Sequence, residues 1–442
     1  MRRERLFPGN TAYRSGRASL CGTVAIVFGP GRRFALGAAA VLTACLLASC
    51  GASDSASDDA PTLLSWYVGP DLVDAPALAA TCNAEAAGAY RIEVEQLPAD
   101  VSARHDLLVR RLRANDDTMD LLSLDSAFTA ELAAAGFLAP VPDDLVGPLS
   151  EGIARPALDA ATYEDRLVVA PWFLDPQVLW FRGNVAERAG LDTSKPISWD
   201  DLIAGAQRLG VTIQVQDRDG SGLAEWVTAL VTGAGGTLVS GNRDDAEVGL
   251  SGDAGRAAAS IVEFYHESEV GPGPSKDALS AFAAPGGGFL VASASAVADP
   301  ALASVSADMV AAAYPTVTDR SVAPLAGIGL AVPKHAPQPA RSYDAIQCLT
   351  SPERLTALMT EAQHSASRLS TYDDKSVAAA YPQRTVTRTA VKTGATVPAT
   401  PYWFQVLGAV DRTWTPTQDV TQDATPDAAQ AAVEAAIEGT LR

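Results

Sequence analysis

The 442-residue chain has little cysteine, histidine, aromatic side chain or positive charge. Its 5 cysteines are too few for a scaffold held by many disulfides or for several zinc sites, and its 4 histidines leave little material for a metal centre. The formal net charge is −19, which argues against nucleic-acid binding because phosphates require a basic surface. We therefore expect no nucleic-acid partner and no cofactor.

Sequence patterns of catalysis are also missing. The glycine clusters at 271–273 and 286–288 lack the spacing of a nucleotide-binding loop, and there is no G-x-S-x-G elbow or Cys–His pair in a nucleophile setting. We therefore expect a protein that is not an enzyme, with no catalytic residues.

Hydrophobic residues are plentiful and make up 48% of the chain, which supports a large buried core. The length allows two or three domains.

The N-terminal segment predicts export. Residues 1–33 hold seven arginines and one acid, and residues 34–48 then run without charge, which is typical of a signal peptide and short for a membrane span. Small residues precede Cys50, as in the lipobox of a bacterial lipoprotein. We expect a signal peptide at 1–49, a lipid on Cys50, a flexible tether at 50–60 and a protein anchored to the outer face of the cell membrane. A plain signal peptide followed by an incidental cysteine is the alternative.

Three cysteines lie beyond residue 49, namely Cys50, Cys82 and Cys348. If Cys50 carries the lipid, the other two form an even pair in an oxidising compartment. We therefore predict a disulfide between Cys82 and Cys348. Two buried thiols are the alternative, because cysteine is commonly buried for its apolar character.

Short apolar runs alternate with helical stretches, which is the pattern of an α/β fold. The expected order begins with strands at 63–68, 91–95 and 120–125, and with helices near 72–87 and 107–112. Such a β-α-β-α-β start implies a parallel sheet with right-handed crossovers. Two more strands are expected at 167–171 and 178–182, with a loop between them, and a helix is expected to begin after the capping residue Ser198.

Aromatic and acidic residues near the ends of expected strands are candidates for ligand binding. Aromatic rings stack on the apolar face of a sugar, and carboxylates accept protons from its hydroxyls. In open α/β sheets, ligands bind at the carboxyl ends of the strands. The aromatic candidates are Trp66, Phe128, Trp172, Trp226, Tyr402 and Trp403, and the acidic candidates are Asp71, Asp125 and Asp175. For each ring taken alone, packing in the core is the alternative.

The turn at 217–222 resembles the start of a calcium loop, with oxygen ligands at its first, third and fifth positions and Gly at the sixth. Thr228 stands at the twelfth position, so the bidentate glutamate of such loops is missing, although Glu225 stands at the ninth. A polar turn is the better interpretation, and we expect no metal here.

Several stretches together carry a family resemblance. They are TCN at 81–83, ANDDTMD at 114–120, LDSAFTAE at 124–131, QVLWFR at 177–182, AGIGLAV at 326–332, IQCL at 346–349 and PATP at 398–401. In this order, and behind a lipobox, they resemble the family 1 extracellular solute-binding proteins. These are receptors of ABC importers for sugars, and the resemblance is greatest to the trehalose-binding lipoproteins of actinobacteria.

The resemblance implies a two-lobe α/β fold of the type II, maltose-binding-protein-like class, with a hinge and a ligand cleft between the lobes. When the family's lobe boundaries are transferred to this chain, lobe 1 is expected at 61–170 and 316–362, and lobe 2 at 171–315 and 363–442. Closure of the lobes around the ligand would be a hinge motion that a two-subunit permease in the membrane recognises. The receptor itself is expected to be a monomer that touches the membrane through its lipid anchor only.

The resemblance also implies site residues. Asp71 and Asp125 match acids that bind sugar hydroxyls in the family, and Asp175 stands where the family has Asn. At three further positions the chain departs from the family: Ser275 replaces a Glu, for which Asp277 is the nearest substitute, Ala294 replaces a Trp, and Val397 replaces an Arg. The resemblance implies a trehalose-like disaccharide or a variant saccharide as the ligand. Because a stacking ring and a multi-donor guanidinium are missing, we expect a pocket tuned to another neutral or an amino-bearing saccharide rather than to trehalose itself.

Two other functions stay open at this point. One is a lipoprotein that has this fold but altered or lost sugar binding, with a non-sugar ligand or an interaction role. The other is an extracellular carbohydrate-active enzyme, which would need two carboxylates facing each other across the bond to be cut.

Overall fold

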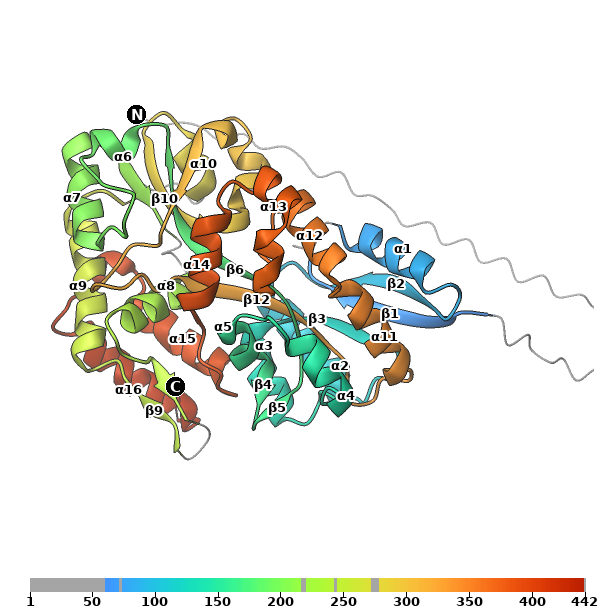
Figure 1. The fold of residues 1–442 in the computed structure, drawn as a ribbon. Helices are drawn as coiled ribbons and strands as arrows, with labels where there is room; N and C mark the ends of the chain where they lie inside the picture. Colours follow the sequence, from blue (N-terminus) through green and yellow to red (C-terminus); the bar gives the residue numbers. More distant parts are fainter. Residues whose placement is uncertain (1–59, 71–73, 216–219, 242–244, 272–277, 441–442) are drawn as a thin grey trace, which may run out of the picture. The chain divides into compact units, whose positions relative to one another are not determined.

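The structure is a computed structural model that describes residues 60–70, 74–215, 220–241, 245–271 and 278–440 (Figure 1). Contacts divide the chain into two units, Met1–Asp58 and Asp59–Arg442, and every helix and strand given below lies in the second unit. Within these described ranges, no helix is long and apolar enough to cross a membrane. The expected signal peptide and the lipid-bearing Cys50 lie outside the described residues.

The central sheet has the strand order β2-β1-β3-β12-β6-β10-β7, with β11 also paired to β6 and β13 to β12. Its strands are β1 (Thr62–Val68), β2 (Tyr90–Gln96), β3 (Leu121–Asp125), β6 (Ala170–Arg182), β7 (Thr212–Gln214), β10 (Gly287–Ser293), β11 (Met309–Ala312), β12 (Pro324–Ala331) and β13 (Ala395–Thr396). Two short hairpins lie outside this sheet, β4 (Thr162–Tyr163) with β5 (Arg166–Leu167) and β8 (Val239–Ser240) with β9 (Glu247–Val248).

Helices connect and cover these strands (Figure 1). They are α1 (Ala75–Glu85), α2 (Val101–Arg113), α3 (Ser126–Ala134), α4 (Asp143–Ser150), α5 (Arg155–Ala161), α6 (Val185–Arg188), α7 (Trp199–Leu209), α8 (Gly220–Gly233), α9 (Asp253–Glu267), α10 (Ala278–Ala283), α11 (Pro339–Leu349), α12 (Pro352–Glu361), α13 (Lys375–Ala380), α14 (Arg384–Thr393), α15 (Trp403–Trp414) and α16 (Thr425–Ile437). Local signals explain several boundaries. Ser198 caps α7 by accepting from the backbone N–H of Asp201 at 3.0 Å, as expected, and Gly210 ends the helix at a φ of 71°.

The predicted β-α-β-α-β start is confirmed. β1 pairs in parallel with both β2 and β3, and α1 and α2 form the two crossovers. The predicted disulfide is confirmed as well: Cys82 of α1 and Cys348 of α11 are bonded, although 266 residues separate them in sequence. The covalent link therefore holds a late helix against the first crossover of the sheet.

The prediction of two strands around residues 167–182 is wrong. One strand, β6, runs from Ala170 to Arg182, and all but the last of its residues are buried. Its first half pairs with β12, and its second half pairs with β10 and β11. The aromatic and aspartate residues that suggested a loop, Trp172 and Asp175, lie inside this strand because it is covered on both faces.

The structure has two large hydrophobic cores, one against the first part of β6 and one against its second part. The first core is built from β1, β2, β3, the start of β6 and helices α1, α2, α3, α11, α12 and α13, and includes Trp66, Phe128 and Trp172. The second core is built from the end of β6 and helices α7, α8, α9, α15 and α16, and includes Trp199, Trp226 and Trp403. Tyr372, Val377 and Tyr381, from the segment expected in the second lobe, pack in the first core.

Candidate functional site

Asp125 occupies the carboxyl end of β3, where the open-sheet rule places a ligand. It is also the N-cap of α3, and its Oδ1 accepts from the backbone N–H of Ala127 at 2.9 Å. The residue as a whole is partly buried. The capping bond fixes the carboxylate in position before any ligand arrives.

A small cavity opens to solvent beside Asp125; the space between its atoms, open solvent included, is about 360 Å³. It is lined by Gly69, Arg104, Ser123, Asp125, Phe128, Phe173 and Ile328. These residues come from the end of β1, from α2, β3 and α3, and from the two strands β6 and β12. The cavity thus combines two aromatic rings, a carboxylate and a guanidinium, a mixture typical of a small polar ligand with an apolar face.

Glu225 reaches the same region from the second core. It lies on α8, is partly buried, and its carboxyl group is hydrogen-bonded to the side chain of Gln177 on β6. Burial, and after it the nearby charge of Asp125, raise the pKa of Glu225 to about 7, against the smaller lowering effect of the Gln177 hydrogen bond. Asp125 of β3 and Glu225 of α8 are therefore close enough for their charges to interact, and Asp125 lines the cavity.

Asp175 has partners of its own inside β6. Its Oδ2 lies 2.6 Å from Nδ1 of His364, and its Oδ1 accepts from the backbone N–H of Ser365 at 2.6 Å. The His364 ring also stacks on Phe173, with ring centroids 4.6 Å apart. Both carboxylate oxygens thus secure the segment after α12 against β6, and Phe173, held in this way, forms a wall of the cavity.

The other aromatic candidates divide into two groups. Trp66, Trp172, Trp226 and Trp403 are at most 2% exposed and pack inside the two cores, which is the packing role that was the alternative for each. Phe128 is buried too, but its ring lines the cavity. Tyr402 is partly buried against the second core and occupies the N-cap position of α15. The structure therefore brings Phe128, and none of the four tryptophans, to the cavity.

Several expected positions lie outside the described residues: Asp71, Asp277, Ser275, Asp217 and Asp219. Two of the positions that depart from the family are described. Ala294 is fully buried just after β10, in a cluster with Trp180 and Phe282, and Val397 packs partly buried against the second core.

Sequence reasoning missed Glu225 as a site residue. A signal was present, because residues 223–233 around it are otherwise uncharged and largely apolar. A lone carboxylate among apolar neighbours on a buried helix is costly unless it serves a partner or a ligand. His105 and Phe404 were also missed; their rings stack at a centroid distance of 3.8 Å, and no local pattern marks a contact between residues 299 positions apart.

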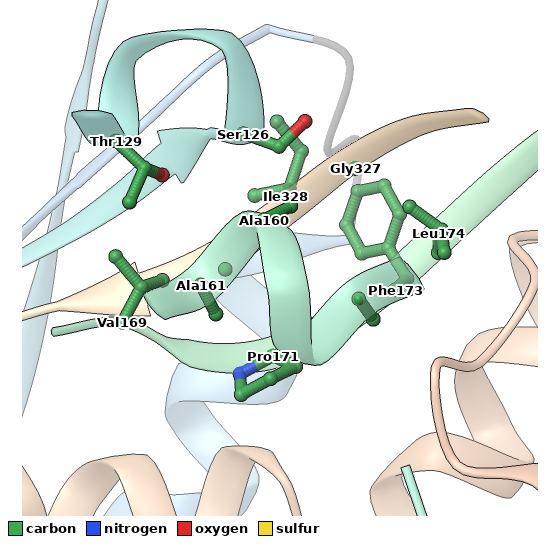
Figure 2. A pocket seen from close by; sticks show the side chains of 12 residues that line it. Ser126, Thr129, Ala160, Ala161, Val169, Pro171, Phe173, Leu174, Gly327 and Ile328 are labelled. Atoms are coloured by element: carbon green, nitrogen blue, oxygen red, sulfur yellow. The ribbon is translucent and has the colours of Figure 1, made fainter. Parts of the chain in front are cut away.

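A second small cavity, of about 280 Å³ when open solvent is included, lies between α3, α5 and the paired strands β6 and β12. The side chains of Val169, Phe173 and Ile328 surround it (Figure 2). A Cβ atom on Gly329 would lie 2.2 Å from a methyl carbon of Val169, so glycine is required for this close approach of the strands. Its lining is mostly apolar, with the hydroxyls of Ser126 and Thr129 as the polar side-chain groups, so this space is less suited than the first cavity to orient a hydrophilic ligand.

The side chains around the first cavity offer both polar and apolar contacts. In the part of the chain that the structure describes, no group of three His, Cys, Asp or Glu residues is arranged to hold a metal ion. Asp125 can accept hydrogen bonds, Arg104 can donate them, and the rings of Phe128 and Phe173 offer apolar faces. This set suits a molecule that carries hydroxyl groups on an apolar ring frame.

Comparison with known proteins agrees with this geometry. The sequence model of the family described as bacterial extracellular solute-binding protein matches residues 70–354. Maltose-bound MalE3 of T. maritima superposes with a TM-score of 0.72 at 20% sequence identity, over 84% of this chain and 99% of that one. The GacH receptor of Streptomyces glaucescens, solved unliganded and with acarbose, gives 0.70 at 19% identity, over 86% and 98%.

A third structure, the cyclic alpha-maltosyl-1,6-maltose binding protein from Arthrobacter globiformis, gives a TM-score of 0.70 at 19% identity, over 86% of this chain and 100% of that one. Such likeness establishes the fold. The expected two-lobe, maltose-binding-protein-like α/β fold is confirmed. The parts built on the first and second cores are called the first and second lobe below.

Proposed function

Because the chain belongs to the family of bacterial extracellular solute-binding proteins, we propose that it is the lipid-anchored receptor of an ABC importer. In this proposal it binds a carbohydrate between its lobes and delivers it to a two-subunit permease when the lobes close. The N-terminal leader and Cys50 supply the anchor, and the receptor acts as a monomer. Its family and its structural neighbours are binding proteins of transport systems, which supports a role without catalysis.

The observation that carries the proposal is the position of Asp125. This carboxylate ends a sheet strand, is fixed by its capping bond, and shares a cavity with the rings of Phe128 and Phe173. Glu225 approaches the same place from the other lobe. A hydroxyl-rich ring between these groups would contact both lobes at once, which is how binding favours the closed form.

The ligand that we propose is a saccharide other than trehalose, either neutral or bearing an amino group. The resemblance to trehalose-binding lipoproteins places a Trp at the position of Ala294 and an Arg at the position of Val397. Losing an anchor of this kind costs about 2 kcal/mol or more, or roughly 30-fold in affinity. The acids Asp125 and Glu225 accept hydrogen bonds from hydroxyls and pair equally well with an ammonium group.

A thermal-shift screen tests this function. Residues 59–442, which form a compact unit, are melted with trehalose, maltose, other disaccharides, amino sugars and polyols. A ligand at 100 times its dissociation constant stabilises by about 2.7 kcal/mol. We expect a shift with one class of saccharide, and loss of that shift in Asp125→Asn. Asp159→Asn, which removes an exposed carboxylate of α5, serves as the matched control and should keep the shift.

Two outcomes would redirect the proposal. A screen without any shift would favour a solute-binding fold with lost or altered sugar binding, the alternative suggested by Ala294 and Val397. Release of new products from an oligosaccharide during the incubation would favour the carbohydrate-active enzyme.

A further inference from the structure

The side chain of Phe404 packs on a different core from the other apolar side chains of its helix. Trp403, Val406 and Val410 of α15 belong to the second core. Phe404, one residue into the same helix, packs partly buried against the first core instead. Its ring is stacked on His105 of α2, with centroids 3.8 Å apart and planes 27° apart, and its centroid lies 5.4 Å from that of Phe128.

The first lobe holds His105 ready for this contact. Nε2 of His105 lies 2.8 Å from Oε2 of Glu131 on α3, where the ring nitrogen donates to the carboxylate. The Phe128 ring meets the imidazole edge-on at 5.3 Å. With Phe404 in place the His105 side chain is 12% exposed, and Glu131 and Phe128 of its own lobe orient the ring. A rigid platform of this kind loses little conformational entropy when another ring stacks on it.

The contacts of Phe404 with His105 and Phe128 differ from the other ring contacts in the elements that they connect. Among the ring pairs of the described residues, those of Phe404 join α15, a helix of the second core, to the first core, whereas Trp66–Trp172 and Trp199–Trp226 stay within one core. Phe128 belongs to this contact and to the cavity wall at once. Whatever moves the two lobes apart must separate Phe404 from His105 and from Phe128.

We propose that Phe404 and His105 form a latch between the lobes, a pair of positioning residues that holds the receptor closed and thereby sets its affinity. The role in affinity rests on the proposed function, because it requires a ligand between the lobes. The latch itself requires only that the lobes hinge. An aromatic pair shifts an equilibrium by roughly 2- to 10-fold, which is enough to move a two-state receptor between mainly closed and mainly open.

The test measures lobe closure without any ligand. Nitroxide labels on Arg110→Cys of α2 and Glu267→Cys of α9, both exposed positions, report the distance between the lobes in residues 59–442, where Cys82 and Cys348 are already bonded. We expect a closed population in the parent, and a shift toward longer distances in both Phe404→Ala and His105→Ala. Phe404→Tyr and His105→Phe keep a stacking ring and should stay closed.

Phe264→Ala is the matched control, because it removes a partly buried phenyl ring that packs on the second core alone. It should leave the distance unchanged. His105→Ala acts from the other lobe, so it serves as the second variant if Phe404→Ala does not fold. A parent that is open without ligand, or alanine variants that close like the parent, would overturn the latch.

The experiment separates the latch from the proposed function. If the alanine variants open but no saccharide binds the parent, the latch stands and the carbohydrate proposal fails. If a saccharide binds, its affinity should fall by roughly 2- to 10-fold in Phe404→Ala and be restored in Phe404→Tyr. Equal saccharide affinity in the parent and in both variants, despite a change in lobe distance, would overturn the link between latch and affinity.

Discussion

The charge of Asp125 in the first lobe acts on the carboxyl group of Glu225 in the second, to which Gln177 of the shared strand β6 is hydrogen-bonded. Both acids carry negative charge in water. Bringing them together in a partly buried place therefore favours a proton on one of them. This relationship makes the stability of the protein depend on pH near neutrality.

The first prediction concerns that pH dependence. The pKa of Glu225 is raised from 4.5 to about 7 in the folded state, so the folded protein binds more protons than the unfolded chain between these values. The free energy of unfolding should therefore be higher at pH 5 and fall as the pH rises through 7, by at most about 3 kcal/mol. Urea melts between pH 5 and 8 measure this fall.

Glu225→Gln should remove most of that fall, because a glutamine does not titrate. Glu267→Gln, which removes an exposed carboxylate from α9 of the same lobe, should keep the parent profile. If the free energy of unfolding of Glu225→Gln fell as steeply with pH as that of the parent, the assignment of this pH dependence to Glu225 would be contradicted.

The second prediction separates two roles for Asp175. Its oxygens accept from the backbone of Ser365 and contact His364, so Asp175→Ala leaves two buried groups without their partner. We expect a loss of about 2–5 kcal/mol in the free energy of unfolding, measured by urea melts. A variant with the stability of the parent but weakened saccharide binding would instead support the sequence-based prediction that Asp175 binds ligand.

The third prediction concerns the disulfide. Cys82 and Cys348 both lie in the first lobe and close a loop of 266 residues that runs through both lobes, so the double variant Cys82→Ala/Cys348→Ala should lose about 2–5 kcal/mol of stability. Mass spectrometry of the unreduced protein should find the two cysteine peptides linked. Two free thiols in protein secreted to an oxidising compartment would contradict the bond.

Local signals allowed much of the first lobe to be predicted. The alternation of short apolar runs with helices gave β1, β2 and β3 with their crossovers, and the position of Asp125 at the end of β3 followed from that order. The pairing of Cys82 with Cys348 followed from counting cysteines beyond the leader. These features depend on neighbours in sequence or on simple arithmetic.

Features that depend on distant partners escaped prediction. β12 enters the sheet between β3 and β6 from about 200 residues downstream of β3, and nothing local announces its antiparallel pairing. The continuity of β6 depends on cover from both cores, which hid Trp172 and Asp175 inside a strand. Glu225 and the Phe404–His105 stack exist only because the two lobes meet.

Calorimetric titration tests the carbohydrate-receptor function most directly. The saccharide with the largest thermal shift is titrated into residues 59–442, the Asp125→Asn variant and the Asp159→Asn control. Asparagine also caps helices well, so Asp125→Asn should keep the fold and the start of α3 while losing the charge at the cavity. The account predicts binding to the parent and the control, and affinity at least roughly tenfold weaker in Asp125→Asn. Equal affinity in all three proteins, or no heat of binding with any saccharide, would contradict it.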